Sequence, residues 1–113
     1  MNYRDLQIVK KILSEITIVE ALIDGFNLER FLKDERTKRA ACMTLINIGE
    51  LVKNLTEEFK SNYNLIPWRA IAGMRDITVH KYQTLKMGDV WVTLENDIPN
   101  LKLNLIGILN EQK

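Results

Sequence analysis

The sequence predicts an all-α fold, an up-and-down four-helix bundle that forms a single domain over residues 1–113. Apolar residues recur three and four positions apart through long stretches, which is the helical spacing. Only five Gly and two Pro interrupt these stretches, and β-branched runs with period-two alternation are absent. A chain of this length suits one hydrophobic core rather than two.

The first helix is predicted from about Tyr3 to Asp24. Asn2 can cap its start, and Gly25 can end it. Its apolar residues cover more than one stripe, so we expect it to pack once within the bundle and once against a partner chain. These residues are Leu6, Ile8, Val9, Ile12, Leu13, Ile16, Val19, Leu22 and Ile23.

The second helix is predicted to begin near Asp34, a good N-cap, after a short connection over Leu28–Lys33. We expect it to continue to the polar loop at residues 61–64. Apolar residues follow one another along it in a heptad-like seam, which favours packing at shallow crossing angles. The seam consists of Ala41, Leu45, Ile48, Val52, Leu55 and Phe59.

Pro67 suits the first turn of a third helix, predicted to carry Trp68 to about Tyr82. The fourth helix is predicted from around Gly88. Pro99 should kink or split it, because proline lacks the N–H that the helix needs. Its apolar seam consists of Trp91, Leu94, Ile98, Leu101, Leu105 and Ile108.

The third helix carries the candidate chemistry. On an ideal helix Arg75 lies in the middle of an otherwise apolar face, where a guanidinium needs a partner or a route to solvent. Snorkelling, or a structural salt bridge to Glu50, would explain it without function. His80 is the only histidine, and Asp76 lies one turn before it, so its carboxylate can reach and orient the imidazole.

Arg75 and His80 are five residues apart, hence about 140° around an ideal helix. Within one chain they would not point at one shared atom. Either the helix loosens near His80, or the site is assembled at a dimer axis from two chains. The broad apolar surface of the first helix favours the dimer.

An arginine and a histidine are suited to RNA cleavage without a metal ion. The histidine can move a proton at the ribose 2′-OH or the leaving oxygen, and the arginine can stabilise the phosphate. The sequence contains no clustered metal ligands, no phosphate-binding Gly-rich loop and no GxSxG motif. The net charge of +1 gives no support for nucleic-acid binding.

Composition also indicates the cellular compartment and excludes some covalent and membrane features. Cys42 is the only cysteine, so an intramolecular disulfide is excluded, and its apolar neighbours favour a core-packing thiol. The start does not resemble a signal peptide, and no stretch approaches the roughly 20 apolar residues of a membrane span. We therefore expect a cytoplasmic protein that needs no cofactor.

The motif Arg75-x4-His80-x-Tyr82 resembles that of the HepT-like branch of the HEPN superfamily. Further matching segments make the resemblance cover nearly the whole chain. They are Ile48-Gly49-Glu50, Ile66-Pro67-Trp68, Ile71-Ala72-Gly73-Met74, Val90-Trp91 and Asp97-Ile98-Pro99. Asp76 stands where members of the family often carry Asn.

The resemblance implies a helical bundle that forms a homodimer, with the two motifs facing each other across a cleft. It also implies that the protein is a toxin that cleaves RNA at this cleft without a metal ion. It implies that Arg75 binds phosphate and that His80 transfers protons. The implied partner is a nucleotidyltransferase antitoxin of the MNT type, which can transfer AMP to Tyr82. On an ideal helix Tyr82 and Arg75 share a face, so AMP there would place bulk and charge beside the arginine.

Two alternatives remain open. The chain can instead be a non-catalytic docking or nucleotide-binding subunit for such a nucleotidyltransferase. It can also be a purely structural dimeric bundle in which Arg75 pairs with Glu50.

Overall fold

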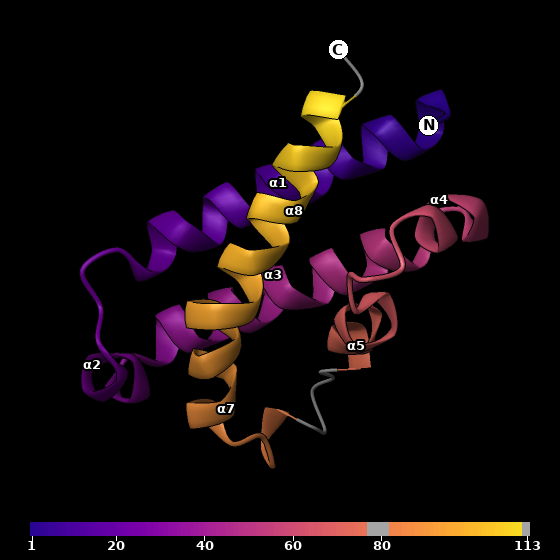
Figure 1. The fold of residues 1–113 in the computed structure, drawn as a ribbon. Helices are drawn as coiled ribbons and strands as arrows, with labels where there is room; N and C mark the ends of the chain where they lie inside the picture. Colours follow the sequence, from indigo (N-terminus) through magenta and orange to yellow (C-terminus); the bar gives the residue numbers. More distant parts are fainter. Residues whose placement is uncertain (77–81, 112–113) are drawn as a thin grey trace.

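The structure is a computed structural model that describes residues 1–76 and 82–111 (Figure 1). Every regular element within these residues is helical, which confirms the predicted all-α class. The elements are α1 (Tyr3–Ile23), α2 (Leu28–Lys33), α3 (Glu35–Lys53), α4 (Glu57–Asn62), α5 (Trp68–Ala72), the 3-10 turn η1 (Gly73–Asp76), α7 (Met87–Val92), the π-helical turn η2 (Thr93–Asp97) and α8 (Ile98–Glu111). None of the described helices is long and apolar enough to cross a membrane.

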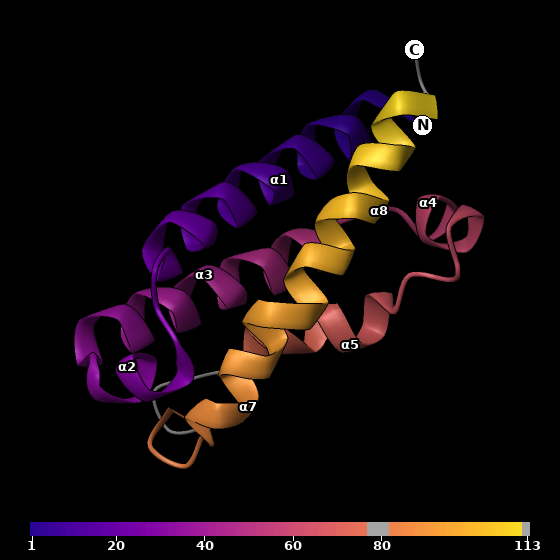
Figure 2. The same cartoon turned by 60° about the vertical axis from the view of Figure 1, so that its left-hand side comes forward.

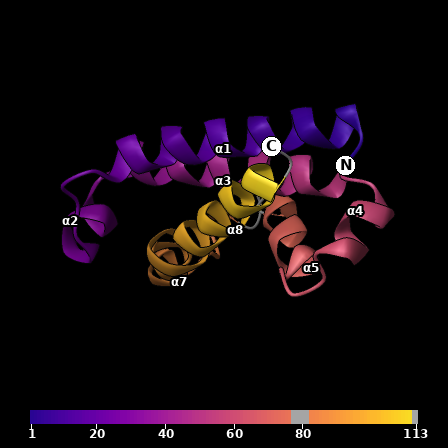
Figure 3. The ribbon, with the colours of Figure 1, turned by 45° about the horizontal axis from the view of Figure 1, so that its top comes forward.

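The two long helices α1 and α3 lie side by side and run in opposite directions, and α8 passes obliquely across them (Figures 2 and 3). Each helix contributes one apolar face to a common core. The predicted seams of α3 and of the last helix are buried in it, as expected. The side chains at its centre include Val9, Ile12, Ile16, Leu45, Ile48, Val52, Leu101 and Leu105.

The second apolar stripe of α1 is mostly used within the chain. Leu13, Leu22 and Ile23 are partly buried and pack against the same core. Ile18 remains 47% exposed. The apolar excess of α1 therefore does not by itself require a partner chain, and the predicted dimer stays a prediction.

The second predicted helix is shorter than expected, and the predicted connection before it is itself helical. Residues Leu28–Lys33 form α2, because Asn27 accepts a hydrogen bond from the Arg30 N–H at 2.8 Å and so caps a first turn. Asp34 then caps α3 as predicted, but α3 ends at Lys53 instead of reaching the loop at 61–64. A separate helix, α4, carries Phe59 into the core.

A buried carboxylate explains this break. Asp5 on α1 is 2% exposed, and its oxygens accept hydrogen bonds from the backbone N–H and the hydroxyl of Thr56, at 3.0 and 2.7 Å. The Thr56 hydroxyl in turn accepts the Phe59 N–H at 3.1 Å and caps α4. The chain must leave the α3 axis for Thr56 to reach Asp5.

The third predicted helix is also wrong as a single regular α-helix. Pro67 precedes α5 as its N-cap residue, and α5 gives way at Gly73 to the 3-10 turn η1. A 3-10 turn advances about 120° per residue rather than 100°. The regular α-helical phase therefore already changes at Gly73–Asp76. Residues 77–81 lie outside the described residues, so the angular relations among Arg75, His80 and Tyr82 stay predictions.

The last helix is irregular next to Pro99, in agreement with the prediction of a kink or split there. A π-helical turn over Thr93–Asp97 joins α7 to α8, and the Ile98 N–H reaches the Thr93 carbonyl five residues back. Pro99 has no N–H for the carbonyl four residues before it, and its ring crowds that carbonyl. The wider turn accommodates both effects while the core-facing side chains on either side stay buried.

We predict that Asp5→Ala lowers the free energy of unfolding by about 1–3 kcal/mol, because two donors of Thr56 lose their buried acceptor. Urea denaturation measures the effect. Thr56→Val removes one of the same hydrogen bonds, so the double variant should lose less stability than the sum of the two single variants. Additive losses would contradict a direct interaction.

Candidate functional site

The predicted motif residues fall in the segment between α5 and α7. The turn η1, which carries the backbone of Arg75 and Asp76, packs against α3. The side chains of Arg75 and Asp76, and the whole of His80, lie outside the described residues. Their roles stay predictions.

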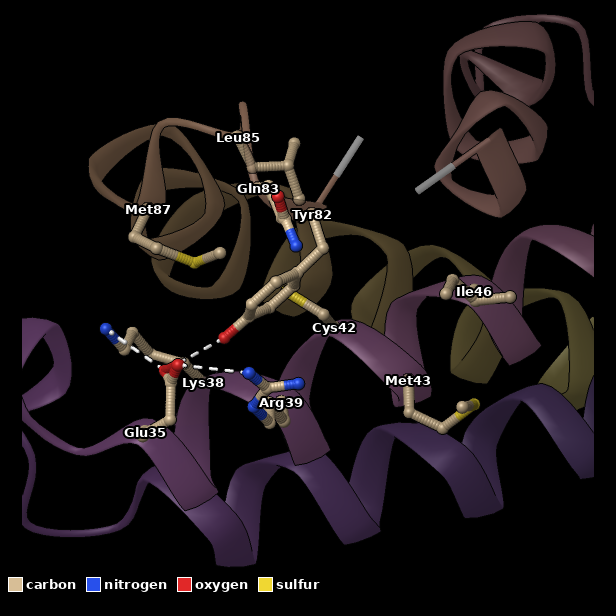
Figure 4. Close-up of a pocket in the computed structure, with 10 residues that line it drawn as sticks. All are labelled: Glu35, Lys38, Arg39, Cys42, Met43, Ile46, Tyr82, Gln83, Leu85 and Met87. Carbon is tan, nitrogen blue, oxygen red and sulfur yellow. Dashed lines mark hydrogen bonds and ion pairs between the residues drawn. The ribbon is translucent and has the colours of Figure 1, made fainter. Parts of the chain in front are cut away.

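Tyr82 is described, and it lies against the N-terminal half of α3 (Figure 4). Its hydroxyl donates a hydrogen bond to Oε2 of Glu35 at 3.0 Å. The guanidinium of Arg39, one helical turn after Glu35, lies over the Tyr82 ring at 4.8 Å from its centroid, a cation–π contact. Tyr82 is thus held at both its ring and its hydroxyl.

Two cations share the Glu35 carboxylate with Tyr82. Lys38 Nζ lies 3.4 Å from Oε2, and an Arg39 guanidinium nitrogen lies 3.4 Å from Oε1. The three charged residues stand at i, i+3 and i+4 on the first turns of α3, so one helix face brings them together. Figure 4 shows the hydroxyl of Tyr82 and both cationic groups converging on this carboxylate.

These groups form one wall of a hollow of about 500 Å³. Its remaining lining is largely apolar and comes from α3 and from the chain on either side of the start of α7. The full lining consists of Glu35, Lys38, Arg39, Cys42, Met43, Ile46, Tyr82, Gln83, Leu85 and Met87. The size is in the range of sites that hold a nucleotide-sized molecule.

The electrostatics of the pair follow from this geometry. The hydrogen bond from Tyr82 lowers the pKa of Glu35 below its ordinary value, and Lys38 and Arg39 lower this pKa further. Burial, followed by the hydrogen bond to Glu35, raises the pKa of Tyr82. Near neutral pH the carboxylate is therefore ionised and the tyrosine hydroxyl is a proton donor.

Cys42 lines the same hollow as Tyr82 and is buried (Figure 4). Burial is the main cause that raises the pKa of its thiol. A thiol held in its neutral form is a poor nucleophile, in keeping with the predicted role in core packing.

Glu50 is exposed on α3 and lines a shallow groove between α1 and α3, together with Lys11 and Glu15. Its backbone carbonyl accepts a hydrogen bond from the Asn54 side chain at 3.1 Å. A pairing of Glu50 with Arg75 would involve a side chain outside the described residues, so it stays a prediction. Among the side chains that the structure describes, which exclude those of residues 75–81, no three His, Cys, Asp or Glu cluster as metal ligands would.

Sequence reasoning missed Glu35, Lys38 and Arg39. A signal was present in their i, i+3, i+4 spacing at a helix start, but such charged clusters are common on solvated faces. What distinguishes this cluster is Tyr82, 47 positions later in the chain than Glu35. Only the tertiary fold brings the two together.

The chain matches the family described as Ribonuclease HepT-like over residues 12–106. It is 36% identical over 105 residues to "Putative RNase TTE0752" of Caldanaerobacter subterraneus subsp. tengcongensis, covering 93% of this chain and 94% of that protein. The chain belongs to the HepT-like ribonuclease family. This result confirms the resemblance drawn from the motif ending at Tyr82.

Other relatives support the same assignment of this HepT-like chain. It is 36% identical over 94 residues to "Probable ribonuclease HepT" of Thermococcus cleftensis, covering 83% of this chain and 86% of that protein. It is also 36% identical over 114 residues to "Gamma-glutamylcyclotransferase and putative RNase MJ0434" of Methanocaldococcus jannaschii, covering 96% of this chain but 49% of that longer protein. No solved structure matches the chain significantly.

We predict that Glu35→Gln lowers the pKa of Tyr82, because the neutral amide no longer penalises the phenolate, while burial continues to raise it. NMR titration of the tyrosine ring carbons measures this. The matched control is Glu111→Gln. Glu111 accepts a hydrogen bond from the Tyr63 hydroxyl at 3.1 Å, so this change should lower the pKa of Tyr63 and leave that of Tyr82 in place. Identical Tyr82 titration in wild type and Glu35→Gln would contradict the pairing.

Proposed function

We propose that this HepT-like chain is a metal-independent endoribonuclease and the toxin of a HEPN/MNT toxin–antitoxin system. The observation that carries the proposal is family membership over residues 12–106, a range that includes the whole motif from Arg75 to Tyr82. The relatives reported above carry ribonuclease names, which supports the same reaction class.

The proposed chemistry uses the two motif residues in different roles. His80 takes the proton from a ribose 2′-OH as that oxygen attacks the adjacent phosphorus, or supplies one to the leaving 5′-oxygen. Arg75 holds the phosphate through two parallel N–H donors and stabilises the charge that develops on it. Asp76 orients the imidazole. Lewis-acid assistance is not required in this scheme, because the arginine supplies the positive charge.

The active form is proposed to be a homodimer in which two motifs face each other. One histidine then serves as base and the other as acid across a shared cleft, which a single motif with one histidine does not provide. The dimer also follows the family resemblance. The apolar face of α1 packs largely within the chain, so the dimer does not depend on that face alone.

The proposed control is transfer of AMP from ATP to Tyr82 by a nucleotidyltransferase antitoxin of the MNT type. Tyr82 supports this because its hydroxyl lies at the surface rather than in the core. Its position six residues after Asp76 keeps it close to the catalytic segment along the chain. An added phosphodiester would bring a negative charge and bulk to an RNA-binding site.

We predict that the purified protein cleaves RNA in the presence of EDTA and that His80→Ala lowers the rate by about 100-fold or more. Arg75→Ala should lower it by a similar factor. Gel analysis of a labelled RNA measures cleavage, and circular dichroism verifies that the variants are folded. Cleavage that appears only with added divalent metal would overturn the mechanism. Absence of cleavage, with an intact complex between this chain and a nucleotidyltransferase, would favour the non-catalytic docking subunit.

We also predict that incubation with an MNT-type nucleotidyltransferase and ATP adds adenylyl groups to the wild type and stops RNA cleavage. Tyr82→Phe should remain unmodified and active. Intact mass spectrometry followed by peptide mapping measures the modification. Adenylylation at Tyr3 or Tyr63 in place of Tyr82 would contradict the assignment.

A further inference from the structure

If Tyr82 is the residue that receives AMP, as proposed above, its contacts with α3 bear on how the transfer occurs. We propose that α3 carries the acceptor site for nucleotidyl transfer: Glu35 orients the Tyr82 hydroxyl and takes its proton, and Lys38 and Arg39 hold the incoming phosphate. The toxin would then contribute catalytic groups to its own neutralisation. The nucleotidyltransferase would contribute the nucleoside triphosphate.

The hydroxyl is oriented for attack. Its hydrogen points to Oε2 of Glu35, at 3.0 Å between the oxygens, so its lone pairs are left for an electrophile. In the transfer, the Tyr82 oxygen forms a bond to the α-phosphorus of the triphosphate while the bond to pyrophosphate breaks. The hydroxyl proton passes to the Glu35 carboxylate. The products are a tyrosyl phosphodiester, pyrophosphate and a neutral Glu35.

A carboxylate is needed here because the hydroxyl does not ionise by itself near neutral pH. Burial raises its pKa, and so does the carboxylate. The proton must therefore leave as the new bond forms, when the tyrosine oxygen loses electron density to phosphorus. A base already hydrogen-bonded to that proton can take it without rearrangement.

The two cations suit the incoming phosphate. Lys38 and Arg39 lie within 3.4 Å of the Glu35 oxygens, beside the reacting hydroxyl. When Glu35 takes the proton it loses its charge, and the phosphodiester formed next to it carries one negative charge. The cations can thus exchange one anionic partner for another, with no change in the net charge of the cluster. The hollow beside them offers room for the nucleoside.

The other two tyrosines provide internal comparisons. Tyr63 also donates to a carboxylate, Glu111, at 3.1 Å. Within the described part of the chain, however, no lysine or arginine pairs with the Glu111 carboxylate, and no cation lies over the Tyr63 ring. Tyr3 is 76% exposed and is therefore more accessible than Tyr63 and Tyr82, which are half-buried. If exposure or a carboxylate alone sufficed, Tyr3 or Tyr63 would react as fast as Tyr82.

Two measurements test the acceptor site. The first is the initial rate of adenylylation by an MNT-type nucleotidyltransferase at saturating ATP. Glu35→Gln keeps a hydrogen-bond acceptor but is a far weaker base, so we expect about a 100-fold lower rate. Glu35→Asp should recover part of it. Arg39→Ala should lower the rate, chiefly through KM for the tyrosine-bearing protein. Glu111→Gln is the matched control and should react like wild type.

The second measurement needs no partner enzyme. An adenosine carrying a sulfonyl fluoride reacts with tyrosine, forming an oxygen–sulfur bond, releasing fluoride and giving up the same hydroxyl proton. We expect peptide mapping to find Tyr82 labelled faster than Tyr3 and Tyr63, and this preference to disappear in Glu35→Gln. Thermal unfolding of each variant checks that the fold is retained.

The outcomes separate this inference from the proposed function. Labelling of Tyr82 by the sulfonyl fluoride that depends on Glu35, without enzymatic adenylylation, would support the activation of Tyr82 by Glu35 and overturn nucleotidyl transfer to this tyrosine. Equal rates for wild type and Glu35→Gln in both measurements would overturn the acceptor site, even if Tyr82 is modified. RNA cleavage by the unmodified wild type tests the ribonuclease proposal independently of either result.

Discussion

The antiparallel packing of α1 on α3 is the constraint on which the rest of the structure depends. Burial of branched side chains such as Ile12, Ile16 and Ile48 stabilises the fold, because it removes apolar surface from water. Each such side chain contributes about 1.5–3 kcal/mol. That seam fixes the rotation of α3 about its own axis. Once one face of α3 is committed to the core, its opposite flank must carry Glu35 and Arg39 outward, where the chain after η1 can meet them.

Polar contacts at the ends of the two long helices determine how the shorter elements attach. At one end, the buried Asp5 carboxylate holds Thr56 and so directs α4 away from the axis of α3. At the other, Glu35 holds Tyr82 and so fixes the chain where it returns before α7. Both are carboxylate–hydroxyl hydrogen bonds between distant parts of the sequence. The first is partly buried, whereas the second lies at the surface, where the Tyr82 hydroxyl is accessible to another molecule.

Irregular turns adjust the positions of the remaining side chains. The π-helical turn beside Pro99 preserves a continuous apolar face from Trp91 to Ile108 despite the missing N–H. The 3-10 turn at Gly73–Asp76 overwinds the chain just where the proposed catalytic motif begins. Regular α-helical geometry therefore ends at Ala72, before the first residue of the motif. The turn that carries the backbone of Arg75 and Asp76 is positioned by its packing against α3.

The sequence by itself determined the class of the fold, the main seams and the family. Apolar residues at three and four spacing are a local pattern, so the buried faces of α3 and α8 could be predicted residue by residue, as could the caps at Asn2 and Asp34. The motif from Arg75 to Tyr82, together with the matching segments before and after it, was sufficient to predict a HepT-like protein. The end of α3 at Lys53 and the Glu35–Tyr82 cluster were decided by the tertiary structure, because partners 47 or 51 positions apart meet only after the helices have packed.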